Sequence, residues 1–395
     1  MLKNHHKNVL IVALIALVNM LGYGIIIPLM YGYSKKFGLS DFENGLLFAL
    51  FSVCQFISTP IIGRLSDKYG RKPMLLISII GTALSFFLMA WAPNALVLFL
   101  SRALDGLTAG NIPVAFAVIS DSTKPEERAK AFGLISSAFN FGFVFGPAIA
   151  ALTVVYHQAL PFLIAGVVTL IAAILTALYL PETNQHMGEV KQSKLFDFKK
   201  MWHTLFDPNI GTTFVISFLF MLAFASAIIY GFQPFTLNVL HITESQNAML
   251  FTLFGAIGLA AQTFLVGRFS KKLGIKKAFS TGILLTAISF IIMFLSRSII
   301  VFVIAMVILA LFNSIAQTLF PTILSQEADA KSQGTIMGLN SSYQSIGMII
   351  GPLLGGAAAT IAISLPFLVG GVLLLACFFL SFRILRPGLK KESAF

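Results

Sequence analysis

Long apolar runs separated by short polar segments dominate the pattern of this chain. About twenty apolar residues in a helix cross the ~30 Å hydrocarbon core of a bilayer, and these runs reach that length. The pattern therefore predicts an all-helical protein with twelve membrane-spanning helices. They are expected near residues 9–32, 44–64, 74–92, 95–119, 131–154, 160–180, 211–235, 246–267, 278–296, 299–324, 334–358 and 363–385.

The composition and the charge distribution agree with a protein that lies in a membrane. Of the 395 residues, 57% are hydrophobic and only 11% are charged, against roughly 25% charged in soluble proteins. Of the 27 lysines and arginines, 23 fall on the side of the N-terminus, three in the opposite loops and one inside a helix. Cytoplasmic loops carry such an excess. We therefore expect a multi-pass protein of a bacterial inner or plasma membrane, with both termini cytoplasmic, and no binding of nucleic acid.

Two motifs recur at nearly the same spacing, which indicates an internal duplication. The segment GRLSDKYGRK at residues 63–72 returns in degraded form at 267–277, an offset of 204 positions. A Gly-x3-Gly-Pro motif at 142–147 returns at 347–352, an offset of 205 positions. Two halves of about six helices each are typical of secondary transporters. We expect an N-terminal bundle over 1–180, a cytoplasmic linker over 181–210 and a C-terminal bundle over 211–395.

The segment at 63–72 resembles the signature loop between the second and third helices of the major facilitator superfamily. Gly63 and Gly70 permit close packing and a tight turn, and topogenic charge alone does not explain Asp67 at its spacing between them. With the half-chain repeat, the resemblance extends over nearly the whole chain. It implies a major facilitator fold, in which two pseudo-symmetric six-helix bundles form an all-α membrane protein.

The resemblance also implies a cytoplasmic gate around this loop. In the family the loop aspartate faces the N-terminal end of the eleventh helix, and the nearby arginine pairs with an acid that ends the fourth. Carried to this chain, Asp67 is expected to meet the positive helix end near Gly334, a contact of ~0.3–1 kcal/mol. Arg71 is expected to pair with Asp121. Such a latch favours the outward-open state, and no equivalent is expected in the second copy, which carries Lys271 instead.

The Gly-x3-Gly-Pro motif of the fifth predicted helix consists of Gly142, Gly146 and Pro147. Glycines four apart let helices approach closely, and proline removes a backbone donor, so generic helix packing is one explanation. The motif also resembles that of the twelve-helix drug–proton antiporters, relatives of tetracycline and quinolone exporters. Ala150 and Ala151 stand where that motif usually has glycines. The resemblance favours efflux as the direction of transport.

Arg102 and Asp105 are the ionisable residues predicted deep inside a helix. Asp105 lies ~15 Å below the outer end of the fourth helix at 1.5 Å per residue, where a charge costs ~2.5–3.5 kcal/mol and requires a partner. Arg102 resembles the fourth-helix arginine that the antiporters associate with proton coupling, whereas Asp105 is outside that pattern. One hypothesis is that Asp105 carries the coupled proton while Arg102 biases its ionisation. The alternative is a static ion pair on one helix face, in which Asp105 stays ionised.

Uncharged polar residues in the predicted helices mark a candidate substrate cavity. Interhelical hydrogen bonds explain about half of such residues equally well. With few charges and 39 phenylalanines, this lining suits a hydrophobic or amphipathic substrate better than a sugar or a polyanion. The candidates are Asn19, Tyr23, Gln55, Asn140, Tyr230, Gln233, Gln262, Asn313, Gln317, Asn340, Tyr343 and Gln344.

The sequence carries no recognisable catalytic machinery. The phosphate-binding motif Gly-x4-Gly-Lys-Ser/Thr is absent, the six histidines show no metal-ligand spacing, and Cys54 and Cys377 fall inside predicted helices. We expect no cofactor and no metal, and a monomer whose partners are membrane lipid, protons and a small-molecule substrate. The linker is expected to be a flexible tether or to carry one amphipathic turn on the membrane near Phe196–Phe206.

These features predict a proton-coupled transporter, not an enzyme, that exports hydrophobic or amphipathic small molecules by alternating access. One alternative is a transporter of a dedicated metabolite, such as a siderophore exporter or a nutrient importer, for which a single tight-binding ligand would be diagnostic. The other is a non-transporting receptor or scaffold on the same fold, which would need an added signalling domain or long tail.

Overall fold

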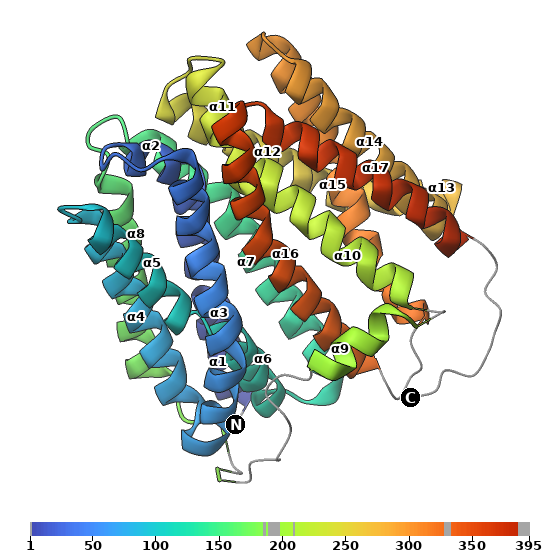
Figure 1. Cartoon of the computed structure of the whole chain (residues 1–395). Helices are drawn as coiled ribbons and strands as arrows, with labels where there is room; N and C mark the ends of the chain where they lie inside the picture. Colours follow the sequence, from blue (N-terminus) through green and yellow to red (C-terminus); the bar gives the residue numbers. More distant parts are fainter. Residues whose placement is uncertain (1, 185–186, 189–197, 208–209, 328–332, 386–395) are drawn as a thin grey trace. The chain divides into compact units, whose positions relative to one another are not determined.

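A computed structural model describes residues 2–184, 187–188, 198–207, 210–327 and 333–385. Within these residues the secondary structure is helical (Figure 1). Twelve helices in the described part of the chain are long and apolar enough to cross a membrane. The predictions of an all-helical fold and of twelve membrane-spanning helices are confirmed.

Several of the membrane-spanning helices consist of consecutive shorter segments. The helices before residue 200 are α1 (Leu2–Ile26), α2 (Met30–Lys35), α3 (Asp41–Tyr69), α4 (Arg71–Ala90), α5 (Ala95–Thr108), α6 (Asn111–Ser122), α7 (Pro125–Thr153), α8 (Leu160–Tyr179) and α9 (Phe198–Leu205). Those that follow are α10 (Gly211–Phe224), α11 (Phe232–Asn238), α12 (Glu244–Ala260), α13 (Val266–Leu273), α14 (Ile275–Leu295), α15 (Ile299–Glu327), α16 (Gln333–Ile361) and α17 (Leu365–Leu385). Two π-helical segments, Ala225–Gly231 and Ala261–Leu265, join α10 to α11 and α12 to α13.

Prolines explain two predicted helices that are interrupted. The helix expected over 9–32 ends at Ile26, because Pro28 has no N–H to donate and its ring crowds the carbonyl four residues earlier. The helix expected over 95–119 is divided between α5 and α6, since Pro113 cannot donate to the Ala109 carbonyl. The break places Gly110 where an added Cβ would lie 2.6 Å from Ile62 of α3, so the junction of α5 and α6 approaches α3 closely.

The described chain forms two compact units that do not follow the sequence halves strictly. The first comprises residues 1–39 and 50–195 together with 243–252. The second comprises residues 40–49, 196–242 and 253–395. A ten-residue segment of each sequence half therefore belongs to the unit formed mainly by the other half.

The two exchanged segments are themselves a repeat, at an offset of 203 positions. Each begins with a capping box, in which a hydroxyl side chain and a side chain three residues later bond each other's backbone N–H. The backbone N–H of Ser40 donates to Glu43 Oε2 at 2.7 Å, and that of Glu43 donates to Ser40 Oγ at 3.3 Å. Thr243 donates in the same way to Gln246 Oε1 at 2.9 Å, and Gln246 to Thr243 Oγ1 at 3.2 Å. The same local chemistry thus starts α3 and α12.

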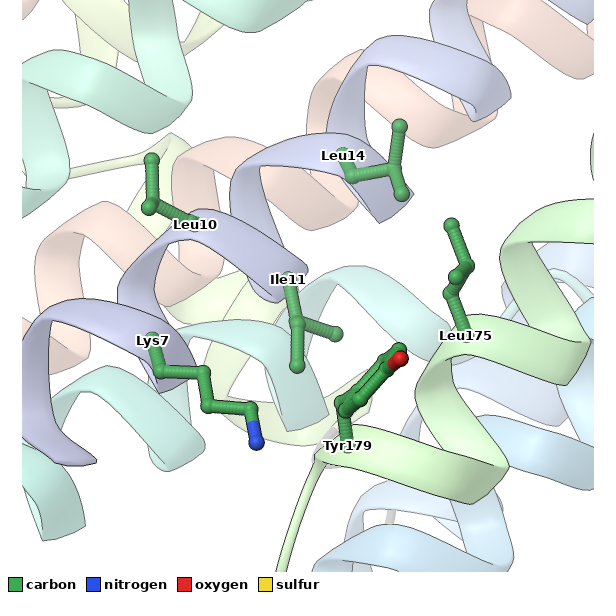
Figure 2. A pocket seen from close by; sticks show the side chains of 6 residues that line it. All are labelled: Lys7, Leu10, Ile11, Leu14, Leu175 and Tyr179. Carbon is green, nitrogen blue, oxygen red and sulfur yellow. The ribbon is translucent and has the colours of Figure 1, made fainter.

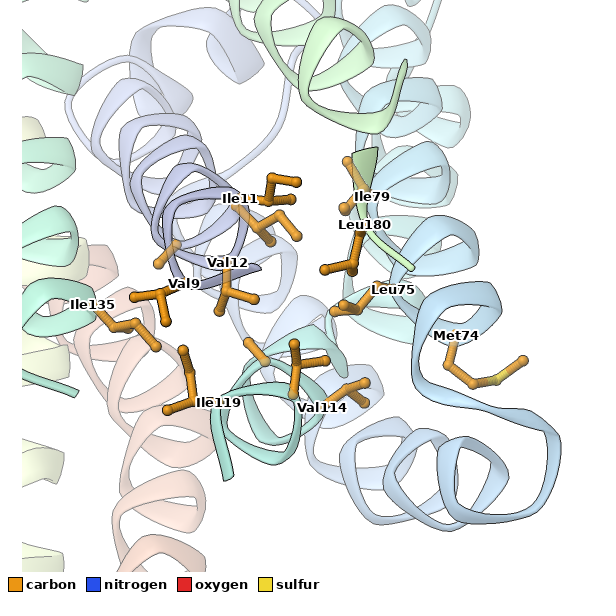
Figure 3. Packing of buried hydrophobic residues seen from close by; sticks show 14 of the residues in the cluster. Val9, Ile11, Val12, Met74, Leu75, Ile79, Val114, Ile119, Ile135 and Leu180 are labelled. Atoms are coloured by element: carbon orange, nitrogen blue, oxygen red, sulfur yellow. The ribbon is translucent and has the colours of Figure 1, made fainter. Parts of the chain in front are cut away.

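Within the first unit, α1 packs against α7 and α8, and α4 packs against α5, α6 and α8. Figure 3 shows a buried apolar cluster in which Val12, Leu75 and Ile119 come from three different helices. Leu180, which follows α8 directly, is also buried in this cluster. The apolar packing therefore fixes the position at which the chain leaves the first bundle.

The glycine motifs mark close helix contacts in both units. On α7, an added Cβ at Gly142 or Gly146 would lie 2.5 Å from a backbone oxygen of α1. On α16, an added Cβ at Gly347 would lie 3.0 Å from the α10 backbone, and one at Gly351 would lie 2.5 Å from Ala225. The repeated motif therefore performs the same packing role in each unit.

Residues 198–205 of the expected amphipathic segment form α9, whereas residues 196 and 197 lie outside those that the structure describes. The Tyr343 hydroxyl donates to the Met201 carbonyl of α9 at 2.6 Å and so ties this helix to α16. Contact of α9 with the membrane surface stays a prediction.

Candidate transport site and cytoplasmic network

A buried ion pair lies within α5. Arg102 Nη1 donates to Asp105 Oδ2 at 3.0 Å, and the two residues are 1% and 6% exposed. Their spacing of three residues puts both side chains on one helix face. Asn94 caps the start of this helix, since its side chain accepts the Val97 N–H at 3.1 Å. Both charges are therefore held away from water, and each depends on the other for compensation.

Side chains of neighbouring helices complete the surroundings of the pair. The guanidinium carbon of Arg102 lies 4.3 Å from the centre of the Phe51 ring of α3, a cation–π contact. The side chains of Thr82 and Ser85 on α4 face the Asp105 carboxylate. Within the described chain, Arg102 Nε is buried without a hydrogen-bond partner. The pair is therefore enclosed, and one donor remains available.

A second polar group connects α1 to α6 in the same unit. Asn111 Nδ2 donates to Asn19 Oδ1 at 3.1 Å. Tyr23 lies one turn along α1 from Asn19. The centre of its ring is 6.4 Å from the centre of the Phe51 ring, which also makes the cation–π contact with Arg102. Sequence analysis did not include Asn111 or Phe51 among the candidates. The Gly110–Asn111 step at the break between α5 and α6 was a usable signal, because a polar residue at such a break lies beside unpaired backbone groups.

The other cavity candidates divide between the two units. Gln55 and Asn140 are half-buried in the first unit. In the second unit, Ser217 Oγ donates to Asn340 Oδ1 at 2.6 Å, and Gln317 Nε2 donates to Asn313 Oδ1 at 3.4 Å. The Tyr230 hydroxyl donates to the Asp41 carbonyl at 2.7 Å. Gln233 is buried, Gln344 half-buried and Gln262 exposed.

Hydrogen bonds thus hold four of the second-unit candidates (Tyr230, Asn313, Asn340 and Tyr343) within their own unit. For Tyr230, Asn340 and Tyr343 this is the interhelical alternative that the sequence left open, whereas Asn313 is bonded to Gln317 within α15. Their contact with a substrate stays a prediction.

Arg71, the first residue of α4, is the centre of a polar network at the signature loop. Its Nε donates to Asp121 Oδ2 at 3.2 Å, and its Nη1 donates to Ser66 Oγ at 2.7 Å and to Asp67 Oδ1. Gly70 has a φ of +104°, the left-handed region that favours glycine. The structure therefore brings together Arg71, Asp67 and Asp121. Gly63 has open space around it, and the predicted contact between Asp67 and Gly334 stays a prediction.

Glu182, which sequence analysis did not identify, anchors this loop. Its carboxylate accepts the backbone N–H groups of Arg71 at 2.8 Å and Lys72 at 3.1 Å, the first two of α4. It also accepts those of Thr183 and Asn184, both at 2.9 Å. A carboxylate at a helix N-terminus satisfies unpaired donors and complements the dipole. Glu182 therefore joins the end of the first bundle to the signature loop.

The second unit has a related but different arrangement at its corresponding helix ends. Lys72 Nζ donates to the Ala177 carbonyl and Lys276 Nζ to the Ile384 carbonyl, both at 2.7 Å. Glu327, at the end of α15, accepts the Thr213 hydroxyl of α10 at 2.6 Å. The lysine contacts are repeated between the units, and the bond of Thr213 to Glu327 joins the same pair of helix ends as the bond of Asn8 Nδ2 to Ser122 Oγ in the first unit, at 3.1 Å.

No group of three or more His, Cys, Asp or Glu side chains is arranged to hold a metal ion in the part of the chain that the structure describes. Cys54 and Cys377 are free thiols. The groups described at the candidate site make hydrogen bonds and an ion pair.

Comparison with known proteins gives one consistent family. The model of the Major Facilitator Superfamily matches residues 12–234 and 214–395. Multidrug resistance protein 2 of Bacillus subtilis is 30% identical over 383 residues, which cover 94% of each chain. The class C tetracycline resistance protein of Escherichia coli is 29% identical and covers 95% of this chain and 96% of its own. The quinolone resistance protein NorA of Staphylococcus aureus is 29% identical, with 88% of each chain covered.

Solved structures show the same fold at lower sequence identity. A bacterial homologue of the human lysosomal transporter Spinster, in an inward-facing and unoccupied conformation, matches with a TM-score of 0.78 at 18% identity. The match covers 97% of this chain and 98% of that one. The nucleoside transporter NupG gives a TM-score of 0.77 at 13% identity, covering 96% of this chain and all of its own.

Proposed function

Because this chain belongs to the Major Facilitator Superfamily and is a multi-pass membrane transporter rather than an enzyme, we propose that it exports hydrophobic or amphipathic small molecules in exchange for protons. The resistance proteins that it resembles over nearly their whole length support export of drug-like compounds. The buried pair of Arg102 and Asp105 in a membrane-spanning helix is the observation that carries the coupling proposal.

The charge balance of the site supports this substrate class. Among the described residues, Arg102 and Asp105 are the only charged side chains that are buried, and together they are neutral. A polyanionic substrate would require several convergent cations, and a strongly hydrated sugar would require many hydrogen-bond partners. Aromatic and amide groups such as Phe51, Tyr23 and Asn111 suit a largely apolar molecule with a few polar atoms.

The proposed coupling step is a proton exchange at Asp105. When its carboxylate takes up a proton, the charge of the pair changes from neutral to that of Arg102 alone. A buried cation without its partner is unfavourable, so this state favours a rearrangement of α5 against α3 and α4. Release of the proton to the cytoplasm restores the pair. Each proton moving down the membrane potential supplies ~2.3 kcal/mol per 100 mV.

Alternating access requires a structure that closes and opens on the cytoplasmic side. We assign this role to the network of Arg71, Asp67 and Asp121, with Gly63 and Gly70 shaping the loop and Gly334 marking the start of the proposed partner helix. The contacts within the first unit support the assignment, because they fix the position of the Asp67 carboxylate. We further propose that both termini lie in the cytoplasm, which the lysine and arginine distribution supports, and that the chain acts as a monomer.

Accumulation of a lipophilic cationic dye in cells tests the proposal. Cells expressing the wild type are expected to hold less dye than cells carrying an empty vector. A protonophore, or the substitution Asp105→Asn at equal expression, is expected to abolish the difference. Dye levels equal to those of empty cells throughout would reject broad drug export and favour a dedicated substrate. Efflux that survives Asp105→Asn would reject this residue as the proton carrier.

A further inference from the structure

A groove on the first unit lies between the beginning of α1 and the end of α8, apart from the proposed transport site. Figure 2 shows its lining, and the cavity has a volume of about 290 Å³. The lining residues are Lys7, Leu10, Ile11 and Leu14 of α1 and Leu175 and Tyr179 of α8.

The groove has a polar end and an apolar remainder. Lys7 Nζ lies 4.6 Å from the centre of the Tyr179 ring, and the Tyr179 hydroxyl oxygen lies at the end of the ring away from the lysine (Figure 2). Leucine and isoleucine side chains line the rest. Leu10 is 61% exposed and Ile11 is 7% exposed, so the first forms an open rim and the second a floor. This arrangement matches an amphiphile with an anionic head and a hydrocarbon chain.

We propose that this groove binds an anionic phospholipid of the cytoplasmic leaflet. Lys7 pairs with the headgroup phosphate, while an acyl chain lies along Leu10, Leu14 and Leu175. The lining does not include Arg102 or Asp105, so the groove is distinct from the proposed transport site. Basic pockets between membrane helices on the cytoplasmic side are suited to such headgroups.

A second cation strengthens the positive potential at the same end of α8. Lys72 Nζ donates to the Ala177 carbonyl, two residues before Tyr179. Since Lys72 is also the second residue of α4 and its backbone N–H donates to Glu182, the headgroup would lie close to the Glu182 carboxylate that caps this helix. Lipid bound here would therefore contact the bundle at the level of the cytoplasmic network.

Native mass spectrometry of the purified full chain, titrated with phosphatidylglycerol or phosphatidylcholine, tests the proposal. Lys7→Gln removes the headgroup cation at an exposed position, and Leu175→Trp fills the apolar part. Lys36→Gln is the matched control, because Lys36 is also an exposed lysine over a tyrosine ring, 5.7 Å from the centre of Tyr33.

The wild type and Lys36→Gln are expected to bind phosphatidylglycerol in preference to phosphatidylcholine. Lys7→Gln is expected to weaken phosphatidylglycerol binding about fivefold and to leave phosphatidylcholine binding unchanged. Leu175→Trp is expected to weaken the binding of both lipids, with its thermal stability checked in the same preparation. Equal affinities of the wild type for the two lipids, or unchanged phosphatidylglycerol binding in Lys7→Gln or in a stable Leu175→Trp protein, would overturn the proposal.

Discussion

The buried pair of Arg102 and Asp105 predicts an unusual pattern of stability changes. The singly substituted proteins Arg102→Met and Asp105→Asn each leave one charged group without its partner, whereas the double variant removes both charges at nearly constant volume. With both residues almost inaccessible to solvent, the double variant is expected to be more stable than either single variant.

The magnitude follows from the burial and the contacts. Removing one partner of a buried ion pair costs ~3–5 kcal/mol, whereas replacing both by apolar or neutral groups is often close to neutral. In Asp105→Asn the Phe51 ring still faces the guanidinium, so the cation–π contact of ~0.5–2 kcal/mol is retained and does not add to the loss. In Arg102→Met the carboxylate retains the side chains of Thr82 and Ser85. Each single variant is therefore expected to lose a few kcal/mol.

Thermal unfolding of the wild type, the two single variants and the double variant, all in one detergent, measures this pattern as a double-mutant cycle. The exposed Arg297→Met serves as the control for removing an arginine, with an expected change within ~0.5 kcal/mol. A favourable coupling energy of a few kcal/mol is expected between the two positions. Losses that simply add in the double variant would refute the reasoning, because they would mean that neither charge compensates the other.

Three further substitutions examine other parts of the structure. Asp67→Asn is expected to reduce dye efflux while expression and thermal stability stay near wild type; normal efflux by a well-expressed protein would reject the latch. Glu182→Ala removes the α4 cap and should cost ~0.5–2 kcal/mol, seen as a lower unfolding temperature than for the exposed Glu126→Ala; equal temperatures would contradict the anchoring role. Gly146→Ala places a Cβ 2.5 Å from the Leu21 carbonyl oxygen and should lower the free energy of unfolding by ~1–3 kcal/mol, whereas Gly133→Ala on the same helix has open space and should not. Similar yields and unfolding temperatures of the two variants would reject tight packing of α1 against α7.

The fold could be predicted from the sequence because membrane-spanning helices are recognised by the length and the hydrophobicity of their apolar runs. Their ends were less certain, since Pro28 and Pro113 interrupt runs whose hydrophobicity continues. Charged turns also continue helices past the predicted ends, as in α3, which extends to Tyr69 although its apolar run was expected to end at residue 64. Hydropathy does not detect such turns, because their hydrogen bonds do not depend on apolar side chains.

The candidate site was predictable where chemistry and position coincide in one segment. Arg102 and Asp105 are three residues apart, so a single helix brings them together. The contact of Arg71 with Asp121 came from the resemblance alone, because 50 positions separate the two residues. Glu182 lies 111 positions from Arg71, and no local pattern reports such a contact. The repeated capping boxes at Ser40 and Thr243 were visible in the sequence, but their exchange between units depends on tertiary packing.

The most direct test of the central claim is substrate-dependent proton movement in proteoliposomes. Purified wild-type protein is reconstituted into vesicles that contain a pH-sensitive dye and have a higher proton concentration inside than outside. A lipophilic cationic substrate is then added outside. The account predicts that substrate uptake and dissipation of the gradient occur together in the wild type, and that both are lost in Asp105→Asn. Substrate uptake at the same rate without a gradient, or proton movement that Asp105→Asn leaves unchanged, would contradict it.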